Sequence, residues 1–317
     1  MRLKELYELI VRKGIEFDPR GREGVKKSLA KVRQGYRKLS KKDKKEFDLE
    51  TLVNPYSDTR ILYGDPKKEI RKLLVGIDME VGELLLADRL NEKRERIDLV
   101  MAHHPEGRAL AGLYQVMHIQ TDILNKVGVS MNAAEGLMKE RISEVERVLL
   151  PVNHTRSVDV ARLLDIPFMC CHTPADNCVT TYLSRLMKKK GPRTVGDVVD
   201  VLKEIPEYKE AIGQKAGPRI ICGEKTSKAG KVFVDMTGGT EGSKKVFARL
   251  SQAGVGTIVC MHLSEEHFKM AKEEYINVII AGHMASDTLG LNLLLDEIEK
   301  EGRFNIISCS GFKRVER

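Results

Sequence analysis

The sequence has no long uninterrupted hydrophobic run. None of its 317 residues lie in a stretch approaching the roughly 18 to 20 apolar residues that cross a bilayer. The N-terminus begins Met1-Arg2-Leu3-Lys4 and lacks the continuous apolar region of a secretory signal peptide. The chain also has no C-x-x-C pair, and its six cysteines are scattered through apolar segments, a pattern that favours reduced thiols over a disulfide framework. We therefore expect a cytoplasmic protein with no membrane segment.

Excess positive charge is absent from most of the chain. The net charge is +8, and residues 1–50 hold 16 Lys or Arg against 9 Asp or Glu, which leaves the remainder almost neutral. The spacing of Leu3, Leu6 and Ile10 predicts a helix here, followed by a glycine break at 21–24 and a second basic helix. No aromatic stacking pattern accompanies the charge. Two interpretations stay open: a surface for nucleic acid or acidic partners, or a solvated helical face.

Strands and helices alternate from residue 72 onward, which predicts an α/β fold with mostly parallel sheets flanked by helices. We expect two α/β lobes with a metal cleft at the strand carboxyl ends, together with a basic helical N-terminal extension. Beyond the apolar segment at 72–78, strands are predicted at 97–102, 129–132, 167–171, 219–222, 231–235, 257–261, 278–281 and 305–309. Helices are predicted at 81–90, 112–127, 135–149, 157–164, 195–204, 244–253, 265–275 and 289–300. The expected division is an extension at 1–60, a first lobe at 61–190, a second lobe at 191–276 and a return to the metal-binding lobe at 277–317.

Three predicted strands end in residues that bind metals. They lead into His103-His104, into His172 with Asp176, and into His283 with Asp287. Because the carboxyl ends of parallel strands share one sheet edge, these groups can meet in one cleft. Imidazoles with a few carboxylates suit zinc, iron, manganese or nickel, and five such groups exceed the needs of one catalytic ion. We therefore expect two divalent ions with a bridging carboxylate and a shared water that serves as the nucleophile.

Four segments carry a family resemblance: Ala102-His103-His104-Pro105, His172-Thr173-Pro174-Ala175-Asp176-Asn177, Thr237-Gly238-Gly239-Thr240, and Asn277 through His283. From about residue 70 to its end, the chain resembles the Nif-three-like dinuclear metal-binding family, also known as type-2 GTP cyclohydrolase I. The resemblance implies metal ligands at His103, His104, Asp176, His283 and Asp287, with Asp176 as the bridge. It also implies a homo-oligomer, commonly a hexameric ring.

The chain departs from the family pattern in two places. Asp287 replaces the usual glutamate and is one methylene shorter, so it is expected to bind through water or to leave one ion weaker. The connection between His104 and His172 is longer than usual, and it contains His118 and His154. Either is a structural histidine or an additional group near the metals.

His172 is expected to line the pocket as a catalytic group, orienting a ligand carboxylate or moving a proton; the alternative is hydrogen bonding at a strand end. His267 falls where the family often has a histidine, and His262 is undecided. The Gly238–Ser243 turn lacks the spacing of a P-loop, but Lys244 and Lys245 follow it. It predicts either contact with a phosphate or nucleotide, or close strand-to-helix packing.

The leading hypothesis is a metal-dependent hydrolase in which metal-bound hydroxide attacks a phosphoester, cyclic amidine or amide, including GTP ring opening. The alternative is a non-enzymatic metal-binding scaffold or regulator that docks partners through its basic segment.

Overall fold

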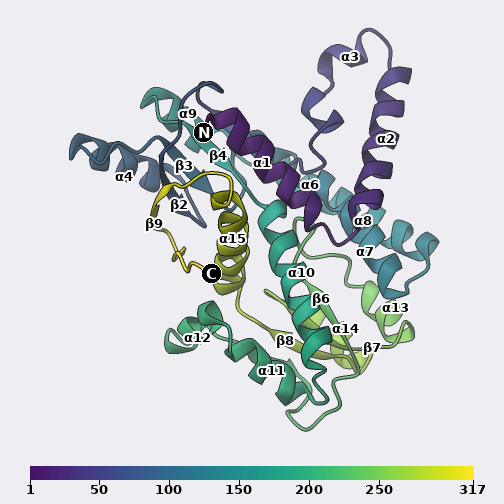
Figure 1. Ribbon diagram of the computed structural model, residues 1–317. Coiled ribbons are helices and arrows are strands. Elements are labelled where there is room, and N and C mark those ends of the chain that lie inside the picture. The colour runs from purple at the N-terminus through teal and green to yellow at the C-terminus, as the bar shows by residue number, and fades with distance from the viewer.

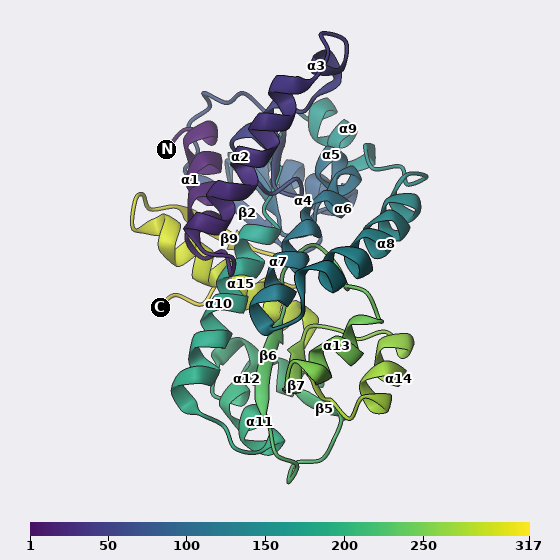
Figure 2. The ribbon, with the colours of Figure 1, turned by 90° about the vertical axis from the view of Figure 1, so that its right-hand side faces the viewer.

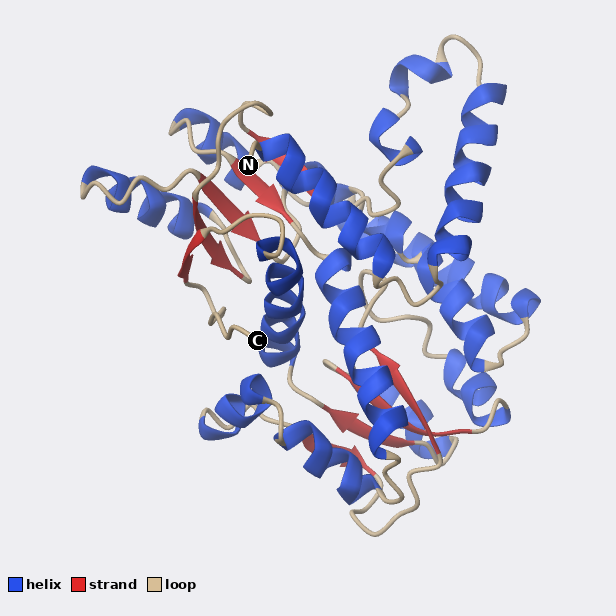
Figure 3. Cartoon of the chain, viewed as in Figure 1, coloured by secondary structure: helices blue, strands red, loops and turns tan.

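The computed structural model describes residues 1–317 and contains two separate sheets, each flanked by helices (Figures 1 and 3). The first sheet has the order β1-β4-β3-β2-β9, and all its pairs are parallel except β1 with β4. The second has the order β5-β8-β7-β6, and only β5 with β8 is antiparallel. The strands span Arg60–Tyr63 (β1), Lys72–Gly76 (β2), Leu99–Ala102 (β3), Phe168–Cys170 (β4), Arg219–Cys222 (β5), Lys231–Asp235 (β6), Val255–Cys260 (β7), Asn277–Ile280 (β8) and Asn305–Ser308 (β9). The predicted α/β class is confirmed.

Helices occupy the connections. They span Leu3–Glu16 (α1), Arg22–Lys38 (α2), Asp43–Glu46 (α3), Leu49–Leu52 (η1, a 3-10 helix), Val81–Glu92 (α4), Gly107–Ala111 (α5), Leu113–Val116 (α6), His118–Val127 (α7), Met131–Leu149 (α8), Arg156–Leu163 (α9), Thr173–Lys190 (α10), Val195–Lys203 (α11), Pro206–Gly213 (α12), Val246–Gln252 (α13), Glu265–Glu273 (α14) and His283–Glu299 (α15). None of them combines the length and hydrophobicity that a membrane span requires.

The strands of the first sheet are buried on both faces. Leu73 and Val75 lie in the apolar core that α1, α10 and α15 share, whereas Leu74 between them lies in the core under α4 and α9. Successive side chains of a strand point to opposite faces, so helices on both sides require the continuous apolar run that the sequence shows here. The face toward α1 is closed by side chains such as Leu3 and Ile10, so the first helix is part of this core.

Two long helices connect the lobes (Figures 1 and 2). Helix α10 begins beside the first sheet and runs toward the second, and α15 follows β8 of the second sheet and leads back to β9 of the first. The expected return at residue 277 thus begins with a strand of the second sheet. The two helices approach closely because residue 290 is glycine: a Cβ there would lie 2.6 Å from the carbonyl oxygen of Ala175.

Some sequence predictions were wrong in detail. The predicted strand at 129–132 does not form, because Gly128 ends α7 in a left-handed conformation and α8 begins at Met131. The predicted helix at 112–127 is instead the pair of helices α6 and α7, preceded by α5. Strand β1 was not predicted, since it lies in a turn-rich segment and has only four residues. Helix α12 was not predicted either.

Candidate metal centre

The residues singled out at strand ends meet in one cluster between the two lobes. His103 and His104 directly follow β3, and His172 follows β4 as the N-cap residue immediately before α10. Asp176 lies in the first turn of α10. His283 and Asp287 lie at the start of α15, after β8. The groups therefore do not share a single sheet edge: four of them follow strands of the first sheet, and His283 and Asp287 follow a strand of the second.

Asp287 stands among three histidines. Its Oδ1 is 3.4 Å from His103 Nε2, and its Oδ2 is 3.5 Å from His104 Nε2 and 3.4 Å from His283 Nε2. The shorter aspartate side chain thus reaches the cluster. Two ligands about 2.1 Å from one tetrahedral ion lie about 3.4 Å apart, so this spacing fits donors that share an ion.

Asp176 stands between two histidines. Its Oδ1 is 3.5 Å from His103 Nε2, and its Oδ2 is 3.7 Å from His172 Nε2. Both carboxylates therefore place their two oxygens toward different imidazoles. Three overlapping sets of donor atoms could each hold a metal ion: His103 with His104 and His172, His104 with His283 and Asp287, and His103 with Asp176 and Asp287.

Three of the imidazoles are oriented by a hydrogen bond at Nδ1, while their Nε2 faces the carboxylates of the cluster. His103 Nδ1 is 3.2 Å from the carbonyl oxygen of Cys171, and His104 Nδ1 is 2.6 Å from Asp78 Oδ1. His172 Nδ1 is 2.8 Å from Asp58 Oδ2. Because each partner only accepts, Nδ1 carries the proton and the lone pair of Nε2 in the neutral ring points into the cluster. This arrangement is typical of histidines that bind metals.

Several polar atoms in the cluster have no hydrogen-bond partner. His103 Nε2 and both carboxylate oxygens of Asp287 are buried and unpaired. Burying a charged carboxylate in this way is costly unless a counter-charge is present. A cation bound between these atoms would satisfy all three, so the donor set fits a metal ion.

The protonation of the metal-free cluster reflects its burial. Burial lowers the pKa of His103 to about 4 and raises that of Asp176 to about 7. Burial also opposes a charged His172, but Asp176 and Asp58 outweigh it and raise the pKa of His172 to about 9. Asp287 has a strongly lowered pKa, because the neighbouring imidazoles outweigh the effect of burial. The metal-free cluster thus retains protons at positions where a cation would replace them.

Two acidic residues of the cluster were missed from the sequence. Asp78 closely follows β2, and its position at the carboxyl end of a parallel strand is a signal that could have revealed it. Asp58 gave no such signal, because it precedes β1. It reaches the cluster because β1 pairs antiparallel with β4, with Arg60 opposite Cys170, so the start of β1 lies beside the end of β4.

The remaining histidines lie outside the three donor sets. His118 is exposed on α7, and His154 Nδ1 is 3.0 Å from the carbonyl oxygen of Val152. His262 comes nearer, with its ring centroid 5.0 Å from that of His283 and its Nδ1 3.3 Å from Glu241 Oε1. His267 Nε2 is 3.1 Å from the carbonyl oxygen of Gly242, so this histidine supports the glycine turn.

The glycine turn is held against α7, where Gln120 Nε2 donates to the carbonyl oxygens of Gly238 and Thr240, each at 2.7 Å. Lys244 pairs with Glu266 at 2.6 Å, and Lys245 pairs with Glu140 at 3.0 Å. These ion pairs leave neither lysine free, and phosphate contact stays a prediction.

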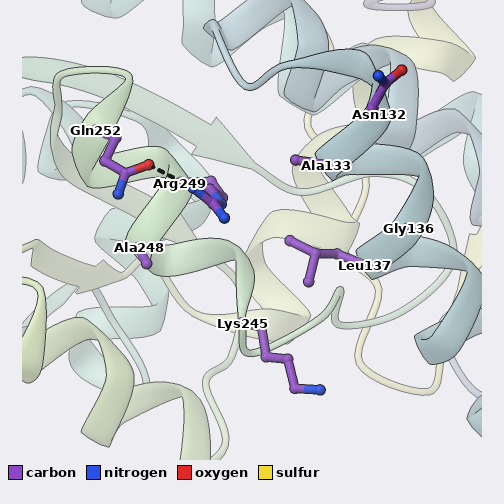
Figure 4. Close-up of a pocket in the computed structure, with 8 residues that line it drawn as sticks. All are labelled: Asn132, Ala133, Gly136, Leu137, Lys245, Ala248, Arg249 and Gln252. Atoms are coloured by element: carbon purple, nitrogen blue, oxygen red, sulfur yellow. Dashed lines mark hydrogen bonds between the residues drawn. The ribbon is translucent and has the colours of Figure 1, made fainter.

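A surface pocket lies elsewhere, between α8 and α13 (Figure 4). It has a volume of about 520 Å³ and is lined by Asn132, Ala133, Gly136, Leu137, Lys245, Ala248, Arg249 and Gln252. None of these residues belongs to the histidine and aspartate cluster. Arg249 donates to Gln252 within the pocket, and the lining offers no group of metal ligands.

Comparison with known proteins finds its matches among solved structures. No protein-family model matches the chain, and no curated protein was found to be similar. A NIF3 superfamily protein from Sphaerobacter thermophilus is 26% identical, with a TM-score of 0.69 over 80% of this chain and 91% of that one. The reduced HcgD protein from Methanocaldococcus jannaschii shares the fold, with 14% identity and a TM-score of 0.53 over 84% and 94% of the two chains. Together with the motifs around the cluster, the similarity to the Sphaerobacter thermophilus protein supports a NIF3-like family for this chain.

Proposed function

We propose that the protein is a dinuclear metal-dependent hydrolase that acts on a phosphoester, a cyclic amidine or an amide. The main support is the set of buried, unpaired atoms at His103 and Asp287, which lie within 4.8 Å of other imidazole and carboxylate donor atoms. Structural hydrogen bonding would leave few such atoms unsatisfied, whereas a metal site requires them.

His103, His104, Asp176, His283 and Asp287 would hold two ions of zinc, iron, manganese or nickel. When bound, the ions would supply Lewis acidity and a water acidic enough to serve as the nucleophile near neutral pH. Asp176 remains the proposed bridge, and Asp287 offers the same geometry because its two oxygens face different histidines. Asp78 and Cys171 would fix the orientation of the two adjacent imidazoles.

His172 is the proposed proton carrier. Its Nδ1 donates to Asp58, which also accepts from Thr173 Oγ1 at 2.6 Å. This fixed ring points Nε2 toward Asp176, and the residue is 7% exposed. A proton held at Nε2 would be available to a leaving group while bulk water stays largely excluded.

Turnover that depends on added metal would test the proposal. The metal-free protein would be loaded with each of the four ions and assayed against GTP, an activated phosphodiester and an activated amide. We expect turnover on one class, with loss of that turnover in Asp176→Asn and retention in the control Asp200→Asn. Asp200 is exposed on α11 and forms no ion pair, so the control changes the net charge equally.

Metal analysis of the same samples distinguishes the alternatives. Two bound ions per chain with turnover support the proposal. Tight binding without turnover on any substrate would favour a metal-binding scaffold, and absence of binding would contradict both.

A further inference from the structure

The positive charge of the protein is concentrated in one structural unit, α2 with α3, which we call the basic hairpin (residues 22–46). It contains eleven Lys or Arg and three Asp or Glu, so its net charge of +8 equals that of the whole chain. All other residues together are therefore neutral. The basic hairpin extends away from both sheets (Figures 1 and 2).

One face of α2 fixes the basic hairpin to the protein. Val25, Leu29, Val32 and Tyr36 recur at helical spacing, and Val25 is buried. Tyr36 packs against Phe47 with ring centroids 4.8 Å apart, and Arg33 Nε donates to the carbonyl oxygen of Leu52 at 2.9 Å. These contacts order the helix, so the charges on its other side are held in place.

Most cations of the basic hairpin lack a partner. Arg22 pairs with Glu16 at 3.5 Å, Lys26 with Glu23 at 3.9 Å, and Lys44 lies 5.4 Å from the ring centroid of Tyr36. Seven others are exposed and make no hydrogen bond, ion pair or ring contact. These are Lys27, Lys31, Arg37, Lys38, Lys41, Lys42 and Lys45. Like charges at i and i+4, such as Lys27 and Lys31, destabilise an isolated helix, so an anionic partner would relieve their repulsion.

The exposed face of α2 is suited to binding a regular array of phosphates. Helix α2 has 17 residues, which corresponds to a length of about 25 Å. A nucleic-acid duplex presents about one negative charge per 1.7 Å of its axis, enough to face every unpaired cation. Insertion of a helix into a membrane surface requires large apolar side chains beside the charges, but Lys27, Lys31, Gln34 and Lys38 form this face. Single strands would require exposed aromatic rings, whereas Tyr36 is packed against Phe47.

We propose that the basic hairpin binds the phosphate backbone of double-stranded nucleic acid without reading its base sequence. This surface is separate from the metal centre and does not depend on the function proposed for it. Contacts from lysine and arginine to phosphate position a protein on a duplex and weaken steeply with salt.

The test uses the full-length protein and fluorescently labelled duplexes of about 20 base pairs, one DNA and one RNA, in KCl from about 50 mM upward. Binding is followed by fluorescence anisotropy. The test variant is K27A/K31A/K38A, which removes three unpaired cations from one face. The matched control is K189A/K203A/K209A, which removes three exposed, unpaired lysines from helices α10, α11 and α12.

We expect the test variant to bind at least about tenfold more weakly near 50 mM KCl. The negative slope of log affinity against log salt concentration should decrease in magnitude by up to about 2.7, because each lost phosphate contact removes about 0.9. The control should keep the affinity and slope of the wild type. Alanine has the highest helix propensity, so circular dichroism should show unchanged helix content in both variants. A chelator should not change duplex binding, which separates this test from that of the metal centre.

Three results would overturn the proposal. Wild-type protein that binds neither duplex near 50 mM KCl has no such surface. Equal loss of affinity in the two triple variants would show diffuse attraction in place of a defined site. Tighter binding to phosphatidylserine vesicles than to either duplex, lost in K27A/K31A/K38A, would identify an anionic membrane as the partner.

Discussion

Substitution of Asp78 should separate metal binding from folding. Its carboxylate is 2.6 Å from His104 Nδ1, and its side chain is 55% exposed. It therefore contacts the cluster from the solvent side and belongs to no apolar core. We expect Asp78→Asn and Asp78→Ala to weaken metal binding while leaving the metal-free fold almost unchanged.

The Asp78 substitutions should affect folding stability less than metal affinity. An exposed ion pair contributes about 0 to 1 kcal/mol to stability, so the free energy of unfolding of the metal-free protein should fall by no more than that. A carboxylate that orients a metal-binding histidine changes metal affinity by about 10- to 100-fold. Such a loss corresponds to about 1.4 to 2.8 kcal/mol. Asparagine keeps an acceptor oxygen but not the charge, so Asp78→Asn should lie near the low end of this range and Asp78→Ala near the high end.

Metal affinity would be measured by competition with a chromophoric chelator, and stability by urea unfolding of the metal-free protein. Asp200→Asn serves as the control of equal charge change. Wild-type metal affinity in both Asp78 variants, beside weak binding in His104→Ala, would show that Asp78 does not orient His104 for the metal. A larger loss of unfolding free energy than of metal-binding free energy in the Asp78 variants would show that Asp78 acts mainly on folding.

Three further predictions concern the surroundings of the cluster. Tyr56→Phe should lower the free energy of unfolding by about 1 to 3 kcal/mol in urea, because it removes the buried 2.9 Å hydrogen bond to Asp18. Gly290→Ala should weaken metal binding in the same titration without loss of helix content, because its Cβ would collide with the α10 backbone and cost about 1 to 3 kcal/mol. The pKa of His172 is raised from 6.5 to about 9 by neighbouring carboxylates against the effect of burial, so the folded state binds its proton more tightly than the unfolded state. Stability of the metal-free protein should therefore be lost as pH rises from 6.5 to 9, and metal affinity should rise over that range. His172→Gln should remove the part of both trends above about pH 7, whereas the part below it remains because the pKa of Asp176 is about 7.

The sequence predicts much of the cluster because its groups follow apolar strands. His103 and His104 end a run whose burial is clear from its composition, and Asp176 and Asp287 each lie four residues after a histidine at the end of a predicted strand. The helices that carry these aspartates were not foreseen: the sequence predicts no helix over α10, and the last predicted helix begins at residue 289, although α15 begins at His283. What sequence alone does not reveal is that the strands belong to two sheets, since the order and partners of strands depend on contacts distant in the sequence.

The hydrogen bonds that hold the imidazoles are harder to foresee. Asp58 lies 114 residues before its partner His172, and only the antiparallel pairing of β1 brings the two together. His118 shows the opposite limit. A helix soon after His104 suggests a return toward the metals, but the short helices α5 and α6 redirect the chain and leave His118 exposed on α7.

A buried polar network couples the cluster to the packing of the lobes. Asn177 directly follows Asp176; its Oδ1 accepts from Thr237 Oγ1 of the second lobe at 2.7 Å, and its Nδ2 donates to Tyr56 Oη at 3.2 Å. Tyr56 in turn donates to Asp18, which lies just after α1. The first residue of the Thr-Gly-Gly-Thr motif thus fixes the second lobe to the helix that carries Asp176. Because His283 and Asp287 arrive from that second lobe, loss of this network should alter the spacing between donors as well as stability. Metal affinity should therefore fall in Tyr56→Phe even though Tyr56 touches no candidate ligand.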